Sequence, residues 1–75
     1  NPFNRTLTSG GSSGGEGALL ALHGSPLGLG TDIGGSVRSP AANNGVYGLK
    51  PTTFRIPKLG LMGVQVGRES IISVI

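Results

Sequence analysis

Two clusters of glycine and serine contain the residues whose types and spacing could do chemistry. The first is residues 10–16, Gly-Gly-Ser-Ser-Gly-Gly-Glu, and the second is residues 34–36, Gly-Gly-Ser. Ser12 precedes Ser36 by 24 residues. Glycines leave the main chain open, so successive N–H groups can converge on one point. A serine hydroxyl beside such donors suits acyl transfer, in which the donors stabilise negative charge on the attacked carbonyl oxygen.

The glycines permit two plainer interpretations, and the first is a simple turn into a helix that Ser36 caps. The second is a phosphate-binding loop, because glycines precede a predicted helix start twice. Gly10 and Gly15 have the P-loop spacing, but Glu16 stands where that loop needs lysine and would repel a phosphate. Three later glycines miss the dinucleotide-binding spacing by one residue: Gly28, Gly30 and Gly34.

The other polar residues offer little support for histidine or metal chemistry. His23 is the only histidine and closes an apolar stretch, where the helix dipole favours it. One histidine, three scattered acidic residues and no cysteine give no metal-ligand spacing. We therefore expect neither a metal nor a cofactor.

The composition limits the possible size, partners and location of the protein. With 15 glycines and three aromatic residues among 75, the chain has a poor core, and we expect it to be a fragment of a larger protein. The net charge of +3 comes from scattered residues, so no nucleic-acid surface is predicted. No apolar run is long enough for a membrane span and no signal-peptide layout is visible, so we expect a cytoplasmic protein.

Helices and strands are predicted to alternate, which indicates an α/β fold. Residues 16–23 predict a buried helix that Gly24 stops, and a strand follows at about 27–31. A second helix is predicted from Ser36 to Asn44, with Pro40 in its first turn and Gly45 after its end. The remaining segments are a predicted strand at 46–50, an irregular stretch at 52–68, and an apolar run at 71–75 that fits either a strand or a helix start.

Three ordered segments resemble the amidase signature family: residues 10–16, residues 30–38 (Gly-Thr-Asp-Ile-Gly-Gly-Ser-Val-Arg) and residues 48–52 (Gly-Leu-Lys-Pro-Thr). The resemblance covers about residues 1–55. Glu16 and the Asn-Pro-Phe-Asn-Arg-Thr lead-in resemble the eukaryotic acetamidase and fatty-acid amide hydrolase branches. The resemblance implies a mixed central sheet flanked by helices. Residues 1–75 would be a partial amidase signature domain, lacking the N-terminal part with the catalytic lysine and the C-terminal remainder.

The resemblance also implies roles for individual residues. Ser36 would be the nucleophile that forms an acyl-enzyme, and Ser12, after a cis peptide bond at Gly11, would relay its proton toward a lysine. The main-chain N–H groups of four residues would form the oxyanion hole: Ile33, Gly34, Gly35 and Ser36. Three further residues match positions that would support the site: Ser13, Asp32 and Arg38.

The implied reaction is hydrolysis of a small-molecule carboxylic amide to an acid and ammonia or an amine. No lysine precedes Ser12 in this sequence, and Lys50 and Lys58 have contexts typical of structural or solvated residues. We therefore expect the 75-residue chain alone to be inactive. Two alternatives stay open: a non-catalytic amidase-like subunit, and the glutamine-amidohydrolysing subunit of a tRNA-dependent amidotransferase. The substrate and the oligomeric state are not assigned.

Overall fold

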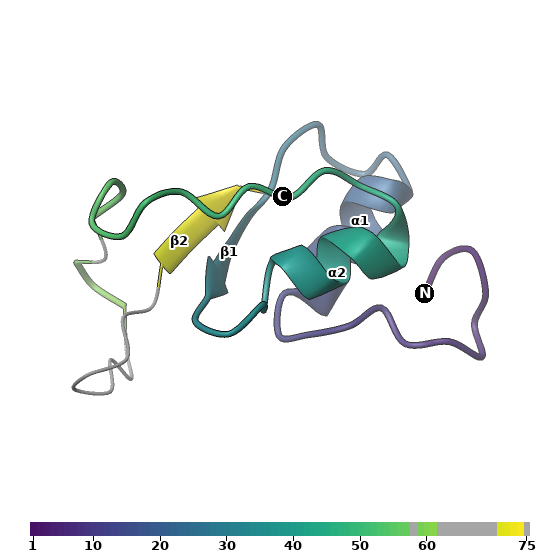
Figure 1. The fold of residues 1–75 in the computed structure, drawn as a ribbon. Helices are drawn as coiled ribbons and strands as arrows, with labels where there is room; N and C mark the ends of the chain where they lie inside the picture. The colour runs from purple at the N-terminus through teal and green to yellow at the C-terminus, as the bar shows by residue number, and fades with distance from the viewer. Residues whose placement is uncertain (58, 62–70, 75) are drawn as a thin grey trace.

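Two helices and two short strands make up the regular structure in a computed structural model that describes residues 1–57, 59–61 and 71–74. Their order is α1 (Gly14–Ala21), β1 (Leu29–Asp32), α2 (Arg38–Asn44) and β2 (Ile71–Val74) (Figure 1). β1 and β2 pair antiparallel, with Leu29 opposite Val74 and Asp32 opposite Ile71. The apolar run at 71–75 therefore contains a strand. Its sequence pattern fits a strand and a helix start equally, and the pairing with β1 distinguishes between them.

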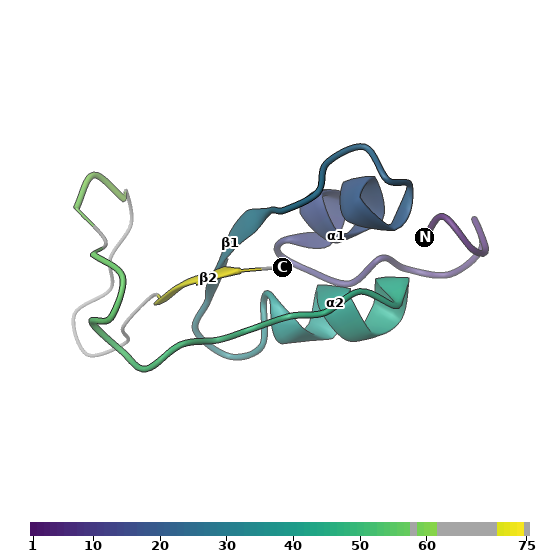
Figure 2. The same ribbon diagram turned by 90° about the horizontal axis from the view of Figure 1, so that it is seen from above.

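The helices α1 and α2 lie side by side, and the strand pair lies beyond one end of them (Figure 2). Leu20 of α1, the N-cap residue Val37 and Ala41 of α2 form a small core, and Val46 packs against it. Neither described helix is long or apolar enough to cross a bilayer. The packing holds the segment before α1 and the turn before α2 close to each other.

The first predicted helix exists, but its bounds are shifted. α1 begins at Gly14 and ends at Ala21, two residues before the predicted positions at both ends. The N–H of His23 donates to the carbonyl of Leu20, and the N–H of Gly24 donates to that of Leu19, both at 2.9 Å. His23, not Gly24, adopts the left-handed conformation, with φ of 58°. This pair of bonds is a Schellman cap, so the predicted role of Gly24 as the stop belongs to His23.

The prediction that this helix is buried all round is wrong for two of its apolar residues. Leu19 is 44% exposed, and Leu22, just after the helix, is 66% exposed. Of the helical residues, Gly14, Gly17 and Leu20 are buried. One reason is that α2 covers a single face of α1 among the described elements.

The second predicted helix is confirmed in its body and its end, and it differs at its start. α2 begins at Arg38, its N-cap is Val37, and no side chain caps it. The interpretation of Ser36 as a helix cap is therefore wrong. Pro40 lies in the first turn as predicted, and Gly45 ends the helix in the left-handed region with φ of 67°.

The predicted strand at 46–50 does not form, and only Leu49 makes an isolated bridge. The segment lies against α2 instead: the N–H of Val46 donates to the carbonyl of Ala41 at 3.0 Å. A Cβ on Gly48 would lie 2.7 Å from the Ala41 side chain. Residues 52–57 and 59–61 contain no helix or strand, as predicted, and the rest of the predicted irregular stretch lies outside the described residues.

Candidate active site

A main-chain hydrogen bond joins the two glycine–serine clusters. The N–H of Ser13 donates to the carbonyl oxygen of Ser36 at 3.0 Å. Ser13 is also the N-cap of α1, and its hydroxyl makes no capping bond. The peptide bond between Gly11 and Ser12 is cis, as the resemblance implies. The fold therefore brings the segment that carries Ser12 against the residue predicted to be the nucleophile.

Gly30 of β1 lies against Ser13 of the first cluster and against Val37, which directly follows the second cluster, and leaves no room for a side chain. A Cβ there would fall on Ser13 Oγ and would lie 2.7 Å from Val37 Cγ2. Val37 is fully buried, so it has little space to move aside. The glycine is therefore required by the close approach of three segments.

Replacing Gly30 with alanine is expected to destabilise the protein that contains this chain by about 1–3 kcal/mol, because the added methyl overpacks the space between Ser13 and Val37. Gly34→Ala is the matched control, since a Cβ on Gly34 would meet nothing within 4 Å. Urea unfolding of both variants measures the difference. Equal stability of the two variants would show that the close packing at Gly30 is wrong.

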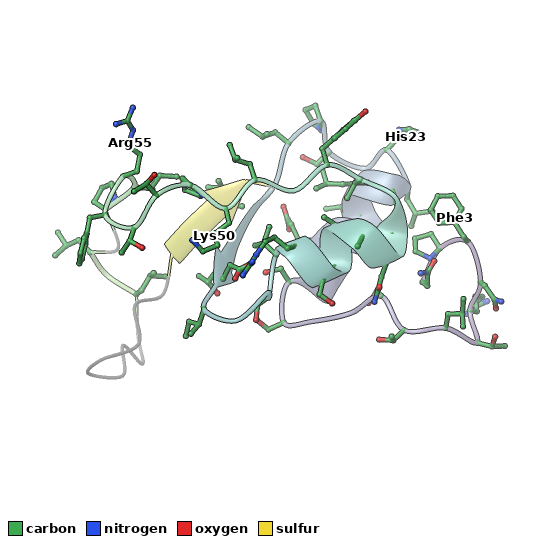
Figure 3. The ribbon with its side chains drawn as sticks, viewed as in Figure 1. Phe3, His23, Lys50 and Arg55 are labelled. Atoms are coloured by element: carbon green, nitrogen blue, oxygen red, sulfur yellow. The ribbon has the colours of Figure 1, made fainter. Side chains whose placement is uncertain are left out.

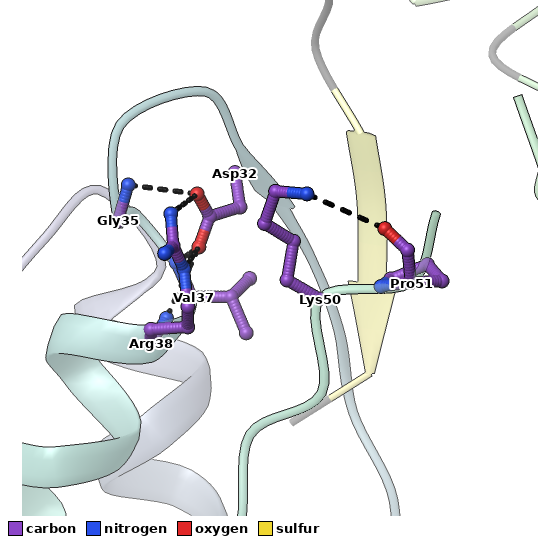
Figure 4. Close-up of polar contacts among 6 residues, drawn as sticks. All are labelled: Asp32, Gly35, Val37, Arg38, Lys50 and Pro51. Carbon is purple, nitrogen blue, oxygen red and sulfur yellow. Dashed lines mark hydrogen bonds and ion pairs between the residues drawn. The ribbon is translucent and has the colours of Figure 1, made fainter. Parts of the chain in front are cut away.

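The carboxylate of Asp32 organises the turn that precedes α2. Its Oδ1 accepts a hydrogen bond from the N–H of Gly35 at 2.7 Å. Its Oδ2 accepts from the N–H groups of Val37 at 3.1 Å and Arg38 at 3.2 Å (Figure 4). These three donors flank Ser36 on both sides. One buried side chain thus fixes the main chain on either side of the predicted nucleophile.

Arg38 completes this arrangement with a two-pronged contact. Its Nε lies 3.1 Å from Asp32 Oδ2 and its Nη2 lies 2.9 Å from Oδ1. The Asp32 side chain is fully buried, whereas that of Arg38 is 53% exposed. The hydrogen bond from Arg38, together with the three main-chain donors, holds the pKa of Asp32 well below its ordinary value, although burial acts in the opposite direction. The same contact raises the pKa of Arg38.

The predicted oxyanion-hole amides divide into two groups. The N–H of Gly35 is directed to Asp32, and Gly35 has a φ of 121° that favours glycine. The N–H groups of Ile33, Gly34 and Ser36 donate to no acceptor within the described part of the chain. Because a reacting oxygen needs donors that are free, these three amides are the available ones.

The two predicted catalytic hydroxyls differ in accessibility. Ser12 is exposed and Ser36 is half-buried. Among residues 1–57, 59–61 and 71–74, neither hydroxyl is engaged in a hydrogen bond. Both hydroxyls are therefore open to a substrate or to groups from outside these residues.

In the described part of the chain, neither His23 nor Lys50 makes a hydrogen bond to Ser12 or Ser36. His23 lies at the end of α1, well away from Lys50 (Figure 3). Lys50 is half-buried, and its Nζ donates to the carbonyl of Pro51 at 3.4 Å. Lys58 lies outside the described residues. No three metal-ligating side chains cluster in the described ranges.

Asn44 contacts Ser9, the residue just before the first cluster, and its residue type and position predict no role for it. Its Nδ2 lies 2.8 Å from the carbonyl oxygen of Ser9. An asparagine just before a helix-ending glycine is common at exposed helix ends, so its residue type alone carries no signal. Its burial, which comes from the packing of α1 against α2, distinguishes it.

Comparison with known proteins adds the family. The family model described as Amidase matches residues 1–75. A relative from Schizosaccharomyces pombe is 61% identical over all 75 residues. The acetamidase of Aspergillus oryzae is 52% identical over the same length, and fatty-acid amide hydrolase 1 of Sus scrofa is 58% identical over 71 residues, 95% of this chain.

These relatives are much longer than the chain. The 75 residues span 14% of the Schizosaccharomyces and Aspergillus proteins, and the matched part spans 12% of the Sus scrofa protein. No solved structure matches the chain significantly. The match along the full chain and the joined glycine–serine clusters lead to one conclusion: this chain belongs to the amidase family.

Proposed function

We propose that the protein containing this chain hydrolyses carboxylic amides through an acyl-enzyme on Ser36. The observation that carries the proposal is the 3.0 Å hydrogen bond from Ser13 to Ser36, which docks one serine cluster on the other. The names of the relatives, amidase, acetamidase and fatty-acid amide hydrolase, support the same class of reaction.

The reaction starts with attack of Ser36 Oγ on the carbonyl carbon of the amide. The Ser36 proton passes to Ser12 Oγ, and the proton of Ser12 passes to a lysine outside residues 1–75. When the tetrahedral intermediate collapses, the C–N bond breaks and the proton returns through Ser12 to the leaving amine. Water then attacks the acyl-enzyme by the same route and releases the acid and free Ser36.

The negative charge on the intermediate needs donors placed before the reaction begins. The free amides of Ile33, Gly34 and Ser36 are suited to this role. Gly35, also predicted to donate, serves instead to fix the turn through Asp32. Loss of a single oxyanion donor typically costs about 10²–10³-fold in rate, so rigid placement of this turn matters.

The proposal places residues 1–75 in a partial amidase signature domain. The β1–β2 pair and the two helices would belong to a mixed central sheet flanked by helices, and the lysine base would come from the preceding part of the protein. Because Ser12 and Ser36 lack that base here, the isolated 75-residue chain is expected to hydrolyse no amide.

A fluorophosphonate probe tests the assignment, because it reacts with activated serine nucleophiles and leaves ordinary serines unmodified. The full-length protein containing this chain is labelled, digested, and the modified residue located by mass spectrometry. We expect the label on Ser36 alone and none after denaturation in urea. A label on another residue, with Ser36 unmodified, would overturn the proposal.

A further inference from the structure

The side chain of Asn44, the last residue of α2, is buried at the point where α2 meets α1 and the segment before α1. Its Nδ2 donates to the carbonyl oxygen of Ser9 at 2.8 Å and to that of Pro40 at 2.8 Å. The bond to Pro40 lies within α2, whereas the bond to Ser9 crosses 35 residues of sequence. Asn44 therefore links the loop before α1 to the end of α2.

This link lies at the entry to the segment that carries Ser12. Ser9 precedes Ser12 by three residues, and Ser13 on the other side is held by its bond to Ser36. The five-residue segment 9–13 is thus fixed at its first residue by Asn44 and at its last by the second cluster. Ser12 lies between the two anchors, so its placement depends on both.

Two glycines allow the close approach that the link needs. A Cβ on Gly17 of α1 would lie 3.0 Å from Asn44 Nδ2 and 3.3 Å from the carbonyl oxygen of Pro40. A Cβ on Gly10, whose φ is 78°, would lie 3.2 Å from the main-chain nitrogen of Pro40. Both would crowd the Asn44 amide or the helix beside it. The two glycines therefore leave room for the Asn44 amide and for the part of α2 beside it.

We propose that Asn44 is a positioning residue for the hydrolytic reaction, acting through the carbonyl of Ser9 to set the placement of Ser12. The role rests on the proposed amide hydrolysis. An amide is needed because both contacts to Asn44 Nδ2 are carbonyl oxygens, which only accept hydrogen bonds. A carboxylate of the same size would face those oxygens with no proton to donate.

The test uses Asn44→Asp in the full-length protein containing this chain, with Asn43→Asp as the matched control. Asn43 is the neighbouring residue, its side chain is exposed, and the charge change is identical. We expect kcat per folded molecule to fall by about 10- to 100-fold in Asn44→Asp, because displacement of a catalytic group by about 1 Å has that effect. KM should change little, since the Asn44 side chain is fully buried in the described part of the chain.

Hydrogen exchange gives a readout that does not depend on activity. Amide protons in residues 9–13 should exchange faster in Asn44→Asp than in Asn43→Asp, while those of α2 stay protected. If exchange in 9–13 is unchanged, or if exchange rises while kcat matches the control, the positioning role is wrong. An inactive wild-type protein would instead refute the proposed function, and the exchange result would still decide whether Asn44 anchors the segment.

A second variant covers the case in which Asn44→Asp does not fold. Gly17→Ala leaves Asn44 in place but crowds its Nδ2 from the side of α1. Gly15→Ala in the same helix is its control, since a Cβ there would meet nothing within 4 Å. We expect kcat to fall severalfold in Gly17→Ala and to be unchanged in Gly15→Ala. Equal kcat values for the two would overturn the proposal.

Discussion

Replacing Ser36 with alanine is expected to lower kcat for amide hydrolysis by at least about 10⁴-fold, because loss of a serine nucleophile removes the covalent route. The variant keeps the main-chain N–H groups proposed as oxyanion donors. It also keeps the hydrogen bond between the clusters, because the main-chain carbonyl of residue 36 still accepts from the N–H of Ser13. The fall in kcat therefore measures the contribution of the nucleophilic hydroxyl alone. Hydrolysis of a simple carboxylic amide by the full-length protein containing this chain gives the rate.

The control is Ser39→Ala, which removes an exposed hydroxyl three residues further along, in the first turn of α2. Its main-chain N–H donates to the carbonyl of Gly35 at 2.7 Å and is unaffected by the change. We expect wild-type kcat in this variant. If Ser36→Ala kept more than a tenth of the wild-type rate, another residue would have to be the nucleophile.

Replacing Asp32 with asparagine is expected to destabilise the protein by about 3 kcal/mol, because it removes the charge of a fully buried carboxylate and leaves main-chain donors of the turn without an acceptor. One amide oxygen cannot replace two carboxylate oxygens that accept five hydrogen bonds. The amide nitrogen would face donors from Gly35 or from Val37 and Arg38. We also expect kcat to fall, since these donors hold the turn that carries Ser36.

The destabilisation should depend on pH in one direction. The pKa of Asp32 in the folded protein lies below its ordinary value of about 3.9. The carboxylate therefore contributes its full stabilisation above about pH 4, and the contribution declines as the pH falls toward the lower folded pKa. The difference in unfolding free energy between wild type and Asp32→Asn should be constant near neutral pH and narrow below about pH 4.

Urea unfolding at a series of pH values measures this difference. Glu16→Gln is the control, because it removes one acidic charge from α1 without touching the turn. Its difference from wild type should not follow the pattern of Asp32→Asn. A difference for Asp32→Asn that grew as the pH fell would contradict the arrangement around Asp32.

The sequence predicts both helices and the first strand because their local signals are strong. Apolar residues with Gly and Pro at the ends indicate α1 and α2, and Gly45 fixes where α2 stops. The predicted bounds of the helices and strands are wrong where tertiary contacts determine the ends of these elements. His23 takes the left-handed cap position that Gly24 was predicted to fill, and residues 46–50 pack on α2 instead of forming a strand.

In the candidate site, too, some features can be predicted from the sequence and others cannot. The spacing of the clusters and their resemblance to the amidase signature predict Ser12, Ser36 and the supporting Asp32 and Arg38. The use of the Gly35 amide by Asp32 could not be predicted, because it depends on how the turn closes. The burial of Asn44 could not be predicted either, because it arises only where α1 packs against α2.

The contact that joins the two clusters involves main-chain atoms alone, the amide of Ser13 and the carbonyl of Ser36. Such a contact does not depend on the hydroxyl groups of the two serines. Loss of the hydroxyls of Ser12 and Ser36 would remove neither the donor nor the acceptor of this bond. The joining of the two clusters is thus independent of the side chains that are proposed to do the chemistry.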